Sequence, residues 1–212
     1  MSFFNFIKVI TYPLLSLVFP TKVYRKENFA RQKSVVCCNH YGAMDIVVLS
    51  RALLWGGCHC VSKEELFSNK FVAWFLTKMG AIAIKRGESD IGAYRQIMQV
   101  LNEGKQLVIF PEGTRNSDPC GPLQPLQTGA ATFAIKGSCP IIPIVSLRKP
   151  KPFRRTYLMV GEPIDVGQFS GISMKEARAQ ATALLTERML ALRADLEEEV
   201  ASRKTRKEKK CK

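Results

Sequence analysis

Several features of common protein classes are missing from this sequence. The apolar run near the N-terminus has no basic segment before it and no small-residue cleavage site after it, so we expect no secretory signal peptide. The seven cysteines are an odd number without disulfide-like spacing, which favours reduced thiols in a cytosolic setting. Cys58-His59-Cys60 has no second pair of ligands nearby, so no metal site is predicted. The Gly-x-Ser-x-Gly elbow of serine hydrolases is absent as well.

Acidic residues are scarce relative to basic ones. The chain of 212 residues has 18 Asp and Glu against 32 Lys and Arg, a formal net charge of +14. This balance predicts an anionic partner, which is a nucleic acid, a membrane surface or an acidic carrier. No nucleic-acid-binding module is recognisable, so no nucleic-acid partner is predicted. A membrane surface and an acidic carrier remain as alternatives.

The most apolar segment, residues 3–19, is too short and too interrupted to span a membrane comfortably. A spanning helix needs about 20 apolar residues, and Lys8 and Pro13 interrupt this run. We therefore expect a helix, kinked or broken near Pro13, that dips into one leaflet; a hydrophobic helix packed on the core is the alternative. A cluster of cations follows that suits anionic head groups, or equally a solvated linker: Lys22, Arg25, Lys26, Arg31 and Lys33.

The stretch Asn39-His40-Tyr41-Gly42-Ala43-Met44-Asp45 follows a short apolar run and precedes a segment with helical apolar spacing. This pattern predicts a strand, a loop and a helix. His40 would leave the strand where site residues of open α/β sheets usually lie, with Asp45 near the start of the helix. The pair predicts a general base, because a carboxylate can fix the tautomer of a histidine and stabilise its imidazolium. A helix-capping Asp45 beside an unrelated histidine is the alternative.

A second stretch, Phe110-Pro111-Glu112-Gly113-Thr114-Arg115-Asn116, also follows an apolar run, Leu107-Val108-Ile109. Together the two stretches resemble the signature of the glycerolipid acyltransferases, the family of 1-acylglycerol-3-phosphate acyltransferases. That family carries N-H-x-x-x-x-D and, further along the chain, F-P-E-G-T-R. The second motif is matched here in full, and its spacing from the first agrees. The resemblance covers roughly residues 34–165.

The resemblance implies acyl transfer from a thioester to the 2-hydroxyl of lysophosphatidic acid, which gives phosphatidic acid. His40 would take the hydroxyl proton, and Asp45 would hold the imidazole ring. General-base help of this kind is worth about 10² to 10⁴ in rate. Cys37 or Cys38 forming an acyl-enzyme is an alternative. We expect the non-covalent route, because adjacent strand side chains point to opposite faces and an apolar run tends to bury thiols.

Further residues are expected to bind substrate. The run from Gly80 to Gly87 resembles the family's second block, whose arginine helps hold the acceptor's phosphate; Arg86 and Arg115 would therefore share this task. Gly113 permits close backbone approach to an oxyanion. A carboxylate repels phosphate, so Glu112 is expected to pair with an arginine or to accept from an acceptor hydroxyl. Thr114, which lies between Gly113 and Arg115, is also expected to bind substrate.

The resemblance implies no resident cofactor. The co-substrate is a thioester of acyl carrier protein or of coenzyme A, and the residues do not choose between them. The expected partners are membrane lipids, lysophosphatidic acid and this donor, at a peripheral or monotopic position on the cytoplasmic face of a membrane. Two rivals remain open: acylation of another lyso-lipid or of glycerol 3-phosphate, and a non-catalytic module that binds anionic lipids.

Two positions depart from the family pattern. Gly42 stands where the family often has Ser or Thr, so a local hydrogen bond is expected to change. Gln127-Thr128 stands where lysines often precede the next glycine, so no lysine contact is expected there. His40 and Asp45 are intact, and activity is therefore still expected.

Apolar runs alternate with helical patterns along the chain, which predicts the α/β class: a single domain with a mixed, largely parallel central sheet flanked by helices, preceded by a membrane-seeking N-terminal helix. Three parts are expected: an N-terminal membrane-associating segment (1–33), an acyltransferase domain (34–200) and a basic, disordered tail (201–212). The expected strands are 35–38, 58–62, the apolar run from residue 80 to residue 84, 106–110, 140–145 and 157–160. The expected helices are 46–54, 71–79, 91–101, 129–136 and 174–200.

Overall fold

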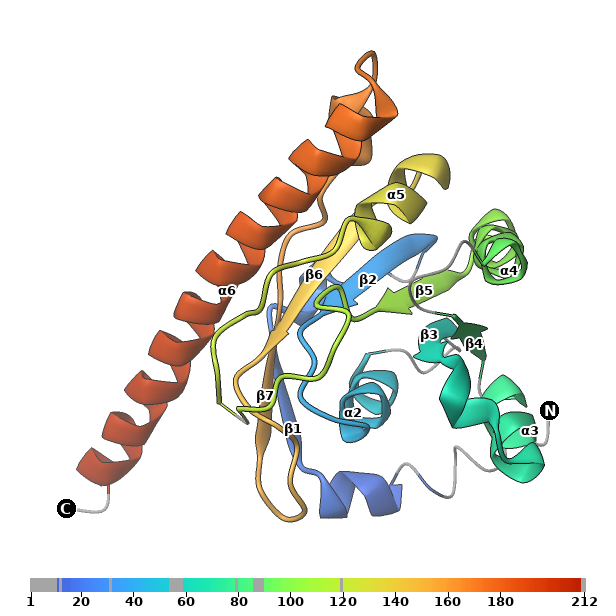
Figure 1. The fold of residues 1–212 in the computed structure, drawn as a ribbon. Coiled ribbons are helices and arrows are strands. Elements are labelled where there is room, and N and C mark those ends of the chain that lie inside the picture. Colours follow the sequence, from blue (N-terminus) through green and yellow to red (C-terminus); the bar gives the residue numbers. More distant parts are fainter. Residues whose placement is uncertain are drawn as a thin grey trace.

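The computed structural model describes residues 11, 13–30, 32–53, 59–78, 80–85, 90–118 and 120–210. A seven-stranded sheet forms its centre (Figure 1). Across the sheet the strands are β1 (Thr21–Tyr24), β7 (Thr156–Val160), β6 (Ile141–Ser146), β2 (Ser34–Cys38), β5 (Gln106–Ile109), β3 (His59–Lys63) and β4 (Ala81–Ile84). Neighbouring strands run parallel except β6 and β7, which are antiparallel. The predicted mixed, largely parallel sheet is confirmed.

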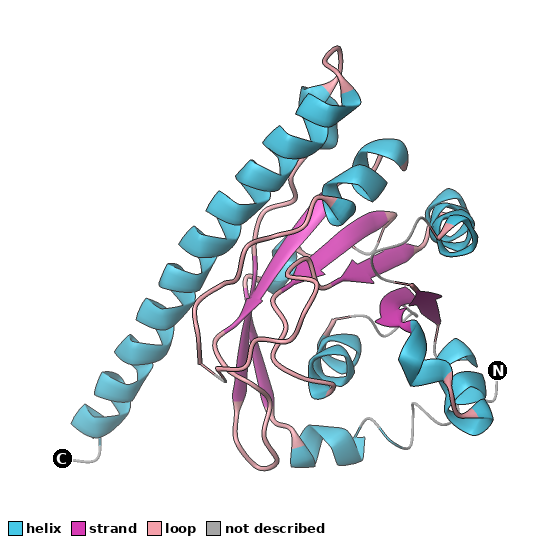
Figure 2. Cartoon of the chain, viewed as in Figure 1, coloured by secondary structure: helices cyan, strands magenta, loops and turns pink. Residues whose placement is uncertain are grey.

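Helices cover both faces of this sheet, as Figure 2 shows. They are α2 (Met44–Ala52), α3 (Lys70–Lys78), α4 (Ile91–Asn102), α5 (Gly129–Lys136) and α6 (Met174–Lys210), with short 3-10 turns η1 (Lys26–Asn28), η2 (Glu64–Phe67) and η3 (Val166–Phe169). The buried side chains of α4, α5 and α6 form one hydrophobic core with the sheet. Those of α2 form a second core on the opposite face, together with Phe19.

The central strand β2 shows why the sequence folds in this way. All five of its residues are buried, and a parallel strand covered on both faces is expected to be continuously apolar. Successive side chains of a strand point to opposite faces. Val35 and Cys37 accordingly join the core under α4, α5 and α6, whereas Val36 and Cys38 join the core under α2.

The pairing of β2 with β5 brings the two sequence motifs together. The two strands are parallel, and Cys37 lies opposite Ile109. The chain therefore leaves both strands at the same edge of the sheet. Residues 39–45 follow β2 there, and residues 110–116 follow β5. This edge is the usual place for a site in an open α/β sheet.

The domain boundaries differ from those expected. β1 lies within the predicted N-terminal segment, but it pairs with β7, so the sheet begins before residue 34. Its four residues, two of them polar, are too short a run to predict a strand. The expected disordered tail is helical as far as Lys210. An ion pair one helical turn apart supports this extension, with Nε of Arg203 3.2 Å from Oε1 of Glu199.

The described part of the N-terminal apolar run is helical over residues 13–18. Leu15, Val18 and Phe19 pack against the core on the α2 face. Leu14 and Leu17 are instead 63% and 70% exposed. No helix in the described ranges is both long and apolar enough to cross a membrane. The leaflet-dipping helix remains a prediction, because residues 1–10 lie outside those ranges.

Candidate active site

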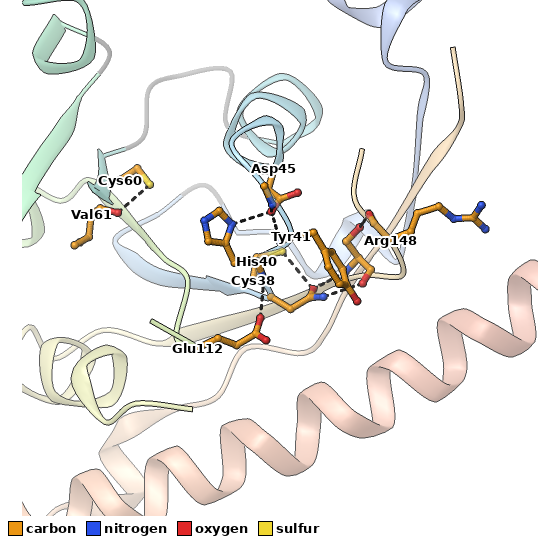
Figure 3. Close-up of polar contacts among 11 residues, drawn as sticks. Cys38, His40, Tyr41, Asp45, Cys60, Val61, Glu112 and Arg148 are labelled. Carbon is orange, nitrogen blue, oxygen red and sulfur yellow. Dashed lines mark hydrogen bonds and ion pairs between the residues drawn. The ribbon is translucent and has the colours of Figure 1, made fainter. Parts of the chain in front are cut away.

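His40 and Asp45 form the predicted pair. Nδ1 of His40 lies 2.8 Å from Oδ2 of Asp45, and the two side chains are only 14% and 4% exposed (Figure 3). A carboxylate at this distance accepts a hydrogen bond from Nδ1–H. The lone pair of the neutral ring is then on Nε2, which is the tautomer of a general base.

The loop before α2 wraps around one oxygen of Asp45. Oδ2 also accepts hydrogen bonds from the backbone N–H groups of Tyr41 at 2.6 Å and of Gly42 at 2.8 Å. The N-cap of α2 is Ala43, and no side chain caps that helix. Asp45 is therefore not a helix cap. Its carboxylate orders the loop and orients the imidazole at once.

Glu112 serves the site differently from the sequence-based expectation. Its side chain is 4% exposed. Oε1 accepts from the backbone N–H of His40 at 2.7 Å, and Oε2 accepts from the backbone N–H of Gln124 at 3.0 Å. Burial raises the pKa of this carboxyl, while the two N–H donors act in the opposite direction. The sequence offered no signal for this role, since the expected partners were an arginine or an acceptor hydroxyl.

Two further contacts fix His40 in place. The backbone N–H of Asn116 donates to the carbonyl oxygen of His40 at 2.7 Å. The imidazole stacks on the Phe110 ring, with centroids 4.0 Å apart and planes 18° apart. The backbone of His40 is thus bonded on both sides by the residues that follow β5, and its ring is held by Asp45 and Phe110. A base held in this way is preorganised for proton transfer.

His40 lies in the wall of a cavity of about 530 Å³. That volume falls within the range of small-molecule sites. Apolar side chains predominate in the wall, which α2, β3, η2, α3, β4, β5 and α5 build between them: Ala43, Ile46, Cys60, Val61, Leu66, Leu76, Ile84, Ile109, Phe110, Pro111, Ala130 and Phe133. The cavity therefore suits a molecule with a hydrocarbon chain, whose polar end would lie at His40.

The cavity wall also contains three of the predicted substrate-binding residues. Arg115 is exposed, and no carboxylate within the described ranges pairs with it. The Thr114 hydroxyl donates to Oε1 of Gln124 at 3.2 Å. Gly113 has a φ of +71°, which favours glycine, but its N–H is used within the turn, donating to the Phe110 carbonyl at 3.1 Å. Of the other two candidates, Glu112 bonds to backbone N–H groups as described above, and Arg86 lies outside the described residues.

The sequence matches the family model described as Acyltransferase over residues 20–147. The chain belongs to the acyltransferase family. It is 32% identical over 201 residues to the 1-acyl-sn-glycerol-3-phosphate acyltransferase of Bacillus subtilis, an alignment that covers 92% of this chain and 96% of the relative. The enzyme of that name from Saccharomyces cerevisiae is 31% identical over 134 residues, covering 62% of this chain and 44% of the yeast protein.

The fold of this acyltransferase is similar to a solved structure. The crystal structure of the 1-acyl-sn-glycerophosphate acyltransferase of Thermotoga maritima superimposes with a TM-score of 0.67 at 23% sequence identity. The match covers 93% of this chain and 78% of that chain. At this identity the likeness establishes the fold.

The acyltransferase holds the loop that carries His40 with residues to which the sequence analysis gave no role. The side-chain amide of Asn39 makes two hydrogen bonds with the backbone of Ser146, in which Nδ2 donates at 2.9 Å and Oδ1 accepts at 2.8 Å. This pairing fastens the loop to the end of β6. Asn39 belongs to the first motif and was available as a signal, but its partner lies over 100 residues away in sequence.

Arg193 of α6 is the other missed residue. Its Nη1 donates to the Tyr41 hydroxyl at 2.7 Å, and its Nη2 donates to the Cys120 carbonyl at 3.0 Å. The Tyr41 hydroxyl in turn donates to the Gly121 carbonyl at 3.0 Å. The long C-terminal helix thereby contacts the loop that carries His40. No motif marks this arginine, because it lies beyond both matched stretches.

We expect Arg193→Ala to lower the free energy of unfolding by about 1–3 kcal/mol, because it leaves the partly buried Tyr41 hydroxyl without its donor and also removes an exposed hydrogen bond to the Cys120 carbonyl. Denaturant unfolding measures this as a lower midpoint with an unchanged slope. Glu197→Gln is the control, since it removes only the exposed pair with Arg193 and is expected to cost less than about 1 kcal/mol. Equal midpoints for Arg193→Ala and Glu197→Gln would contradict the role of Arg193.

Proposed function

We propose that this acyltransferase transfers a fatty acyl group from an acyl thioester to the 2-hydroxyl of 1-acylglycerol 3-phosphate, giving phosphatidic acid. The names of the relatives support the substrate, and one structural observation carries the chemistry. A histidine oriented by a buried carboxylate stands in the wall of a largely apolar cavity, which also contains Arg115, an arginine without an ion-pair partner among the described residues. A non-catalytic lipid-binding module would not need the oriented histidine.

The reaction follows from the tautomer of His40. Nε2 takes the proton of the acceptor's 2-hydroxyl as the oxygen attacks the thioester carbonyl carbon. The carboxylate of Asp45 stabilises the resulting imidazolium through Nδ1–H. As the tetrahedral intermediate collapses, the carbon–sulfur bond breaks and the leaving thiolate takes the proton from Nε2. Each step uses groups already in position, so little reorganisation is required.

The acceptor is positioned by its two ends. The apolar wall accommodates a hydrocarbon chain, and the guanidinium of Arg115 can bind the phosphate oxygens as a planar fork. This places the hydroxyl between the two, where His40 lies. The donor in this proposal is a thioester of either acyl carrier protein or coenzyme A, and the enzyme works at the cytoplasmic face of a membrane.

The test is acyl transfer from a palmitoyl thioester to lysophosphatidic acid in detergent micelles. We expect phosphatidic acid as the product. A monoacylglycerol and glycerol 3-phosphate, offered separately, serve as acceptors that lack either the phosphate or the acyl chain. Faster turnover of either one than of lysophosphatidic acid would overturn the proposed acceptor.

We expect Arg115→Ala to raise the KM for lysophosphatidic acid about tenfold or more, since losing about 1.4 kcal/mol of phosphate binding changes a binding constant by ten. Steady-state kinetics with varied acceptor measure the effect. Arg115→Lys is the matched control, which keeps the charge but loses the bidentate fork. Its KM for lysophosphatidic acid is expected to lie between those of the wild type and Arg115→Ala. An equal loss of turnover on monoacylglycerol would show that Arg115 does not act on the phosphate.

A further inference from the structure

The loop between β6 and β7, residues 147–155, is the most basic exposed loop that the structure describes near the site. It contains five cations and no acidic residue. All five line a hollow of about 150 Å³ together with Cys120 and Thr156: Arg148, Lys149, Lys151, Arg154 and Arg155. Such a concentration of one charge attracts an anionic partner.

The tip of this β6–β7 loop presents an aromatic ring to water. Phe153 is 75% exposed, the largest exposed fraction among the large hydrophobic residues described. Its φ is +57°, a conformation that costs energy for any residue with a side chain. The turn is nevertheless defined by hydrogen bonds, since the N–H of Phe153 donates to the Val18 carbonyl at 2.6 Å and the N–H of Arg154 donates to Lys151 at 3.2 Å. The fold therefore holds this ring outward.

The same hydrogen bonds join the loop to the N-terminal helix. Val18 ends the helical residues 13–18, and the N–H of Thr156 donates to the Pro20 carbonyl at 2.8 Å. Leu14 and Leu17, one helical turn apart on that helix, are exposed. Figure 1 shows the loop and the helix side by side at the lower edge of the molecule. An exposed aromatic ring and exposed leucines thus lie beside five cations that form no ion pair with any described residue.

We propose that the β6–β7 loop and the exposed face of residues 13–18 form a docking surface for an anionic membrane. Phe153, Leu14 and Leu17 would enter the interfacial region, and the flanking cations would bind the head groups. An acidic carrier protein would also be attracted by the cations. It would not require the leucines on the neighbouring helix, nor an aromatic ring held in water at the loop tip, so the membrane is the favoured occupant.

This surface lies close to the catalytic loop. A Cβ at Gly42 would come within 3.0 Å of Cε of Lys149, so the base of the basic loop touches the residue next but one to His40. Ser146, which ends β6, is bonded to Asn39. Docking through this loop would therefore bring the membrane, in which a lipid acceptor resides, near the general base.

The test is flotation of the full-length protein with phosphatidylcholine vesicles, with and without phosphatidylglycerol. We expect Phe153→Ser to weaken binding roughly tenfold on both kinds of vesicle, because it removes the apolar contact. We expect the triple variant Lys151→Ala, Arg154→Ala and Arg155→Ala to weaken binding only on the anionic vesicles, by roughly fivefold for each cation removed. The readout is binding, so it does not depend on the proposed reaction.

Matched controls come from α6, whose N-terminal end lies away from the loop (Figure 1). Leu190→Ser removes another exposed apolar side chain, and Lys175→Ala with Arg178→Ala removes two exposed cations; both are expected to bind like the wild type. Wild-type binding by Phe153→Ser or by the triple variant would overturn the proposal. If the triple variant instead slowed acyl transfer only from an acyl carrier protein donor, the loop would be a carrier-docking surface.

Discussion

Replacing His40 with alanine is expected to lower kcat for phosphatidic acid formation about 10²- to 10⁴-fold, with little change in the KM for lysophosphatidic acid. In the proposed mechanism the imidazole provides the proton transfer, whereas the apolar wall and Arg115 provide the binding. Asp45 would still accept the N–H groups of Tyr41 and Gly42 in the variant, so the loop should keep its fold. Steady-state kinetics in detergent micelles, with a palmitoyl thioester as donor, measure the loss.

Asp45→Asn separates the charge from the geometry. If the amide oxygen takes the position of Oδ2, it can still accept all three hydrogen bonds, and its NH₂ takes the position of Oδ1, which has no partner among the described residues. The hydrogen bonds to the Oδ2 position are then kept and the negative charge is lost, at the cost of a buried NH₂ donor where Oδ1 has no partner among the described residues. We expect kcat to fall between that of the wild type and that of His40→Ala, because the imidazolium formed during proton transfer is no longer stabilised by a charge.

Cys38→Ala is the control for the covalent alternative. Cys37 and Cys38 are fully buried, and burial raises the pKa of both thiols well above the usual range, so neither supplies a thiolate near neutral pH. We expect Cys38→Ala to keep kcat within about threefold of the wild type, less than 1 kcal/mol in activation free energy. A loss as large as that of His40→Ala would reopen the acyl-enzyme route. Wild-type activity of the His40→Ala variant would contradict the general-base mechanism.

The second large effect is expected from Glu112→Gln, which should lower both the free energy of unfolding and kcat. The carboxylate accepts one backbone N–H at each oxygen. An amide has only one acceptor oxygen, so its NH₂ group must face either the N–H of His40 or that of Gln124. A buried donor left without an acceptor costs about 1–3 kcal/mol. Denaturant unfolding measures the stability, and micelle kinetics measure the turnover.

Thr114→Ala is the matched control for Glu112→Gln. It removes a hydrogen bond to Gln124 in the same turn, but at an exposed position. We expect a change of less than about 0.5 kcal/mol. If Glu112→Gln kept wild-type stability while only its KM for lysophosphatidic acid rose, Glu112 would contact the substrate as the sequence analysis expected, and the backbone role would be wrong.

The sequence predicted the pairing of His40 with Asp45 because that contact is local. His40 and Asp45 are five residues apart and share one loop, so strand, turn and helix spacing was enough to place them together. The sheet was predictable for a similar reason. Buried parallel strands such as β2 are apolar in most of their residues and alternate with helices along the chain, and this pattern is visible without any knowledge of the pairing.

What the sequence could not provide depends on contacts between distant segments. Glu112 was assigned to the substrate because a carboxylate beside a phosphate site suggests a pairing with arginine, and nothing local showed that two backbone N–H groups would claim both oxygens. Arg193 gave no signal, because an arginine on a long charged helix is usually solvated. β1 was missed because its strand character comes from pairing with β7 rather than from its own residues.

The two hydrogen bonds of the His40 backbone also limit which segments can be exchanged between related enzymes to make chimaeras. The N–H and the carbonyl of His40 are both claimed by residues that follow β5, namely Glu112 and Asn116. A crossover between the two motifs would therefore separate partners that must match to within a fraction of an ångström. Chimaeras that exchange the two stretches as one cassette should fold and turn over, whereas single-stretch grafts should not. In laboratory evolution by gene shuffling, residues 39–45 and 110–116 should therefore be exchanged together.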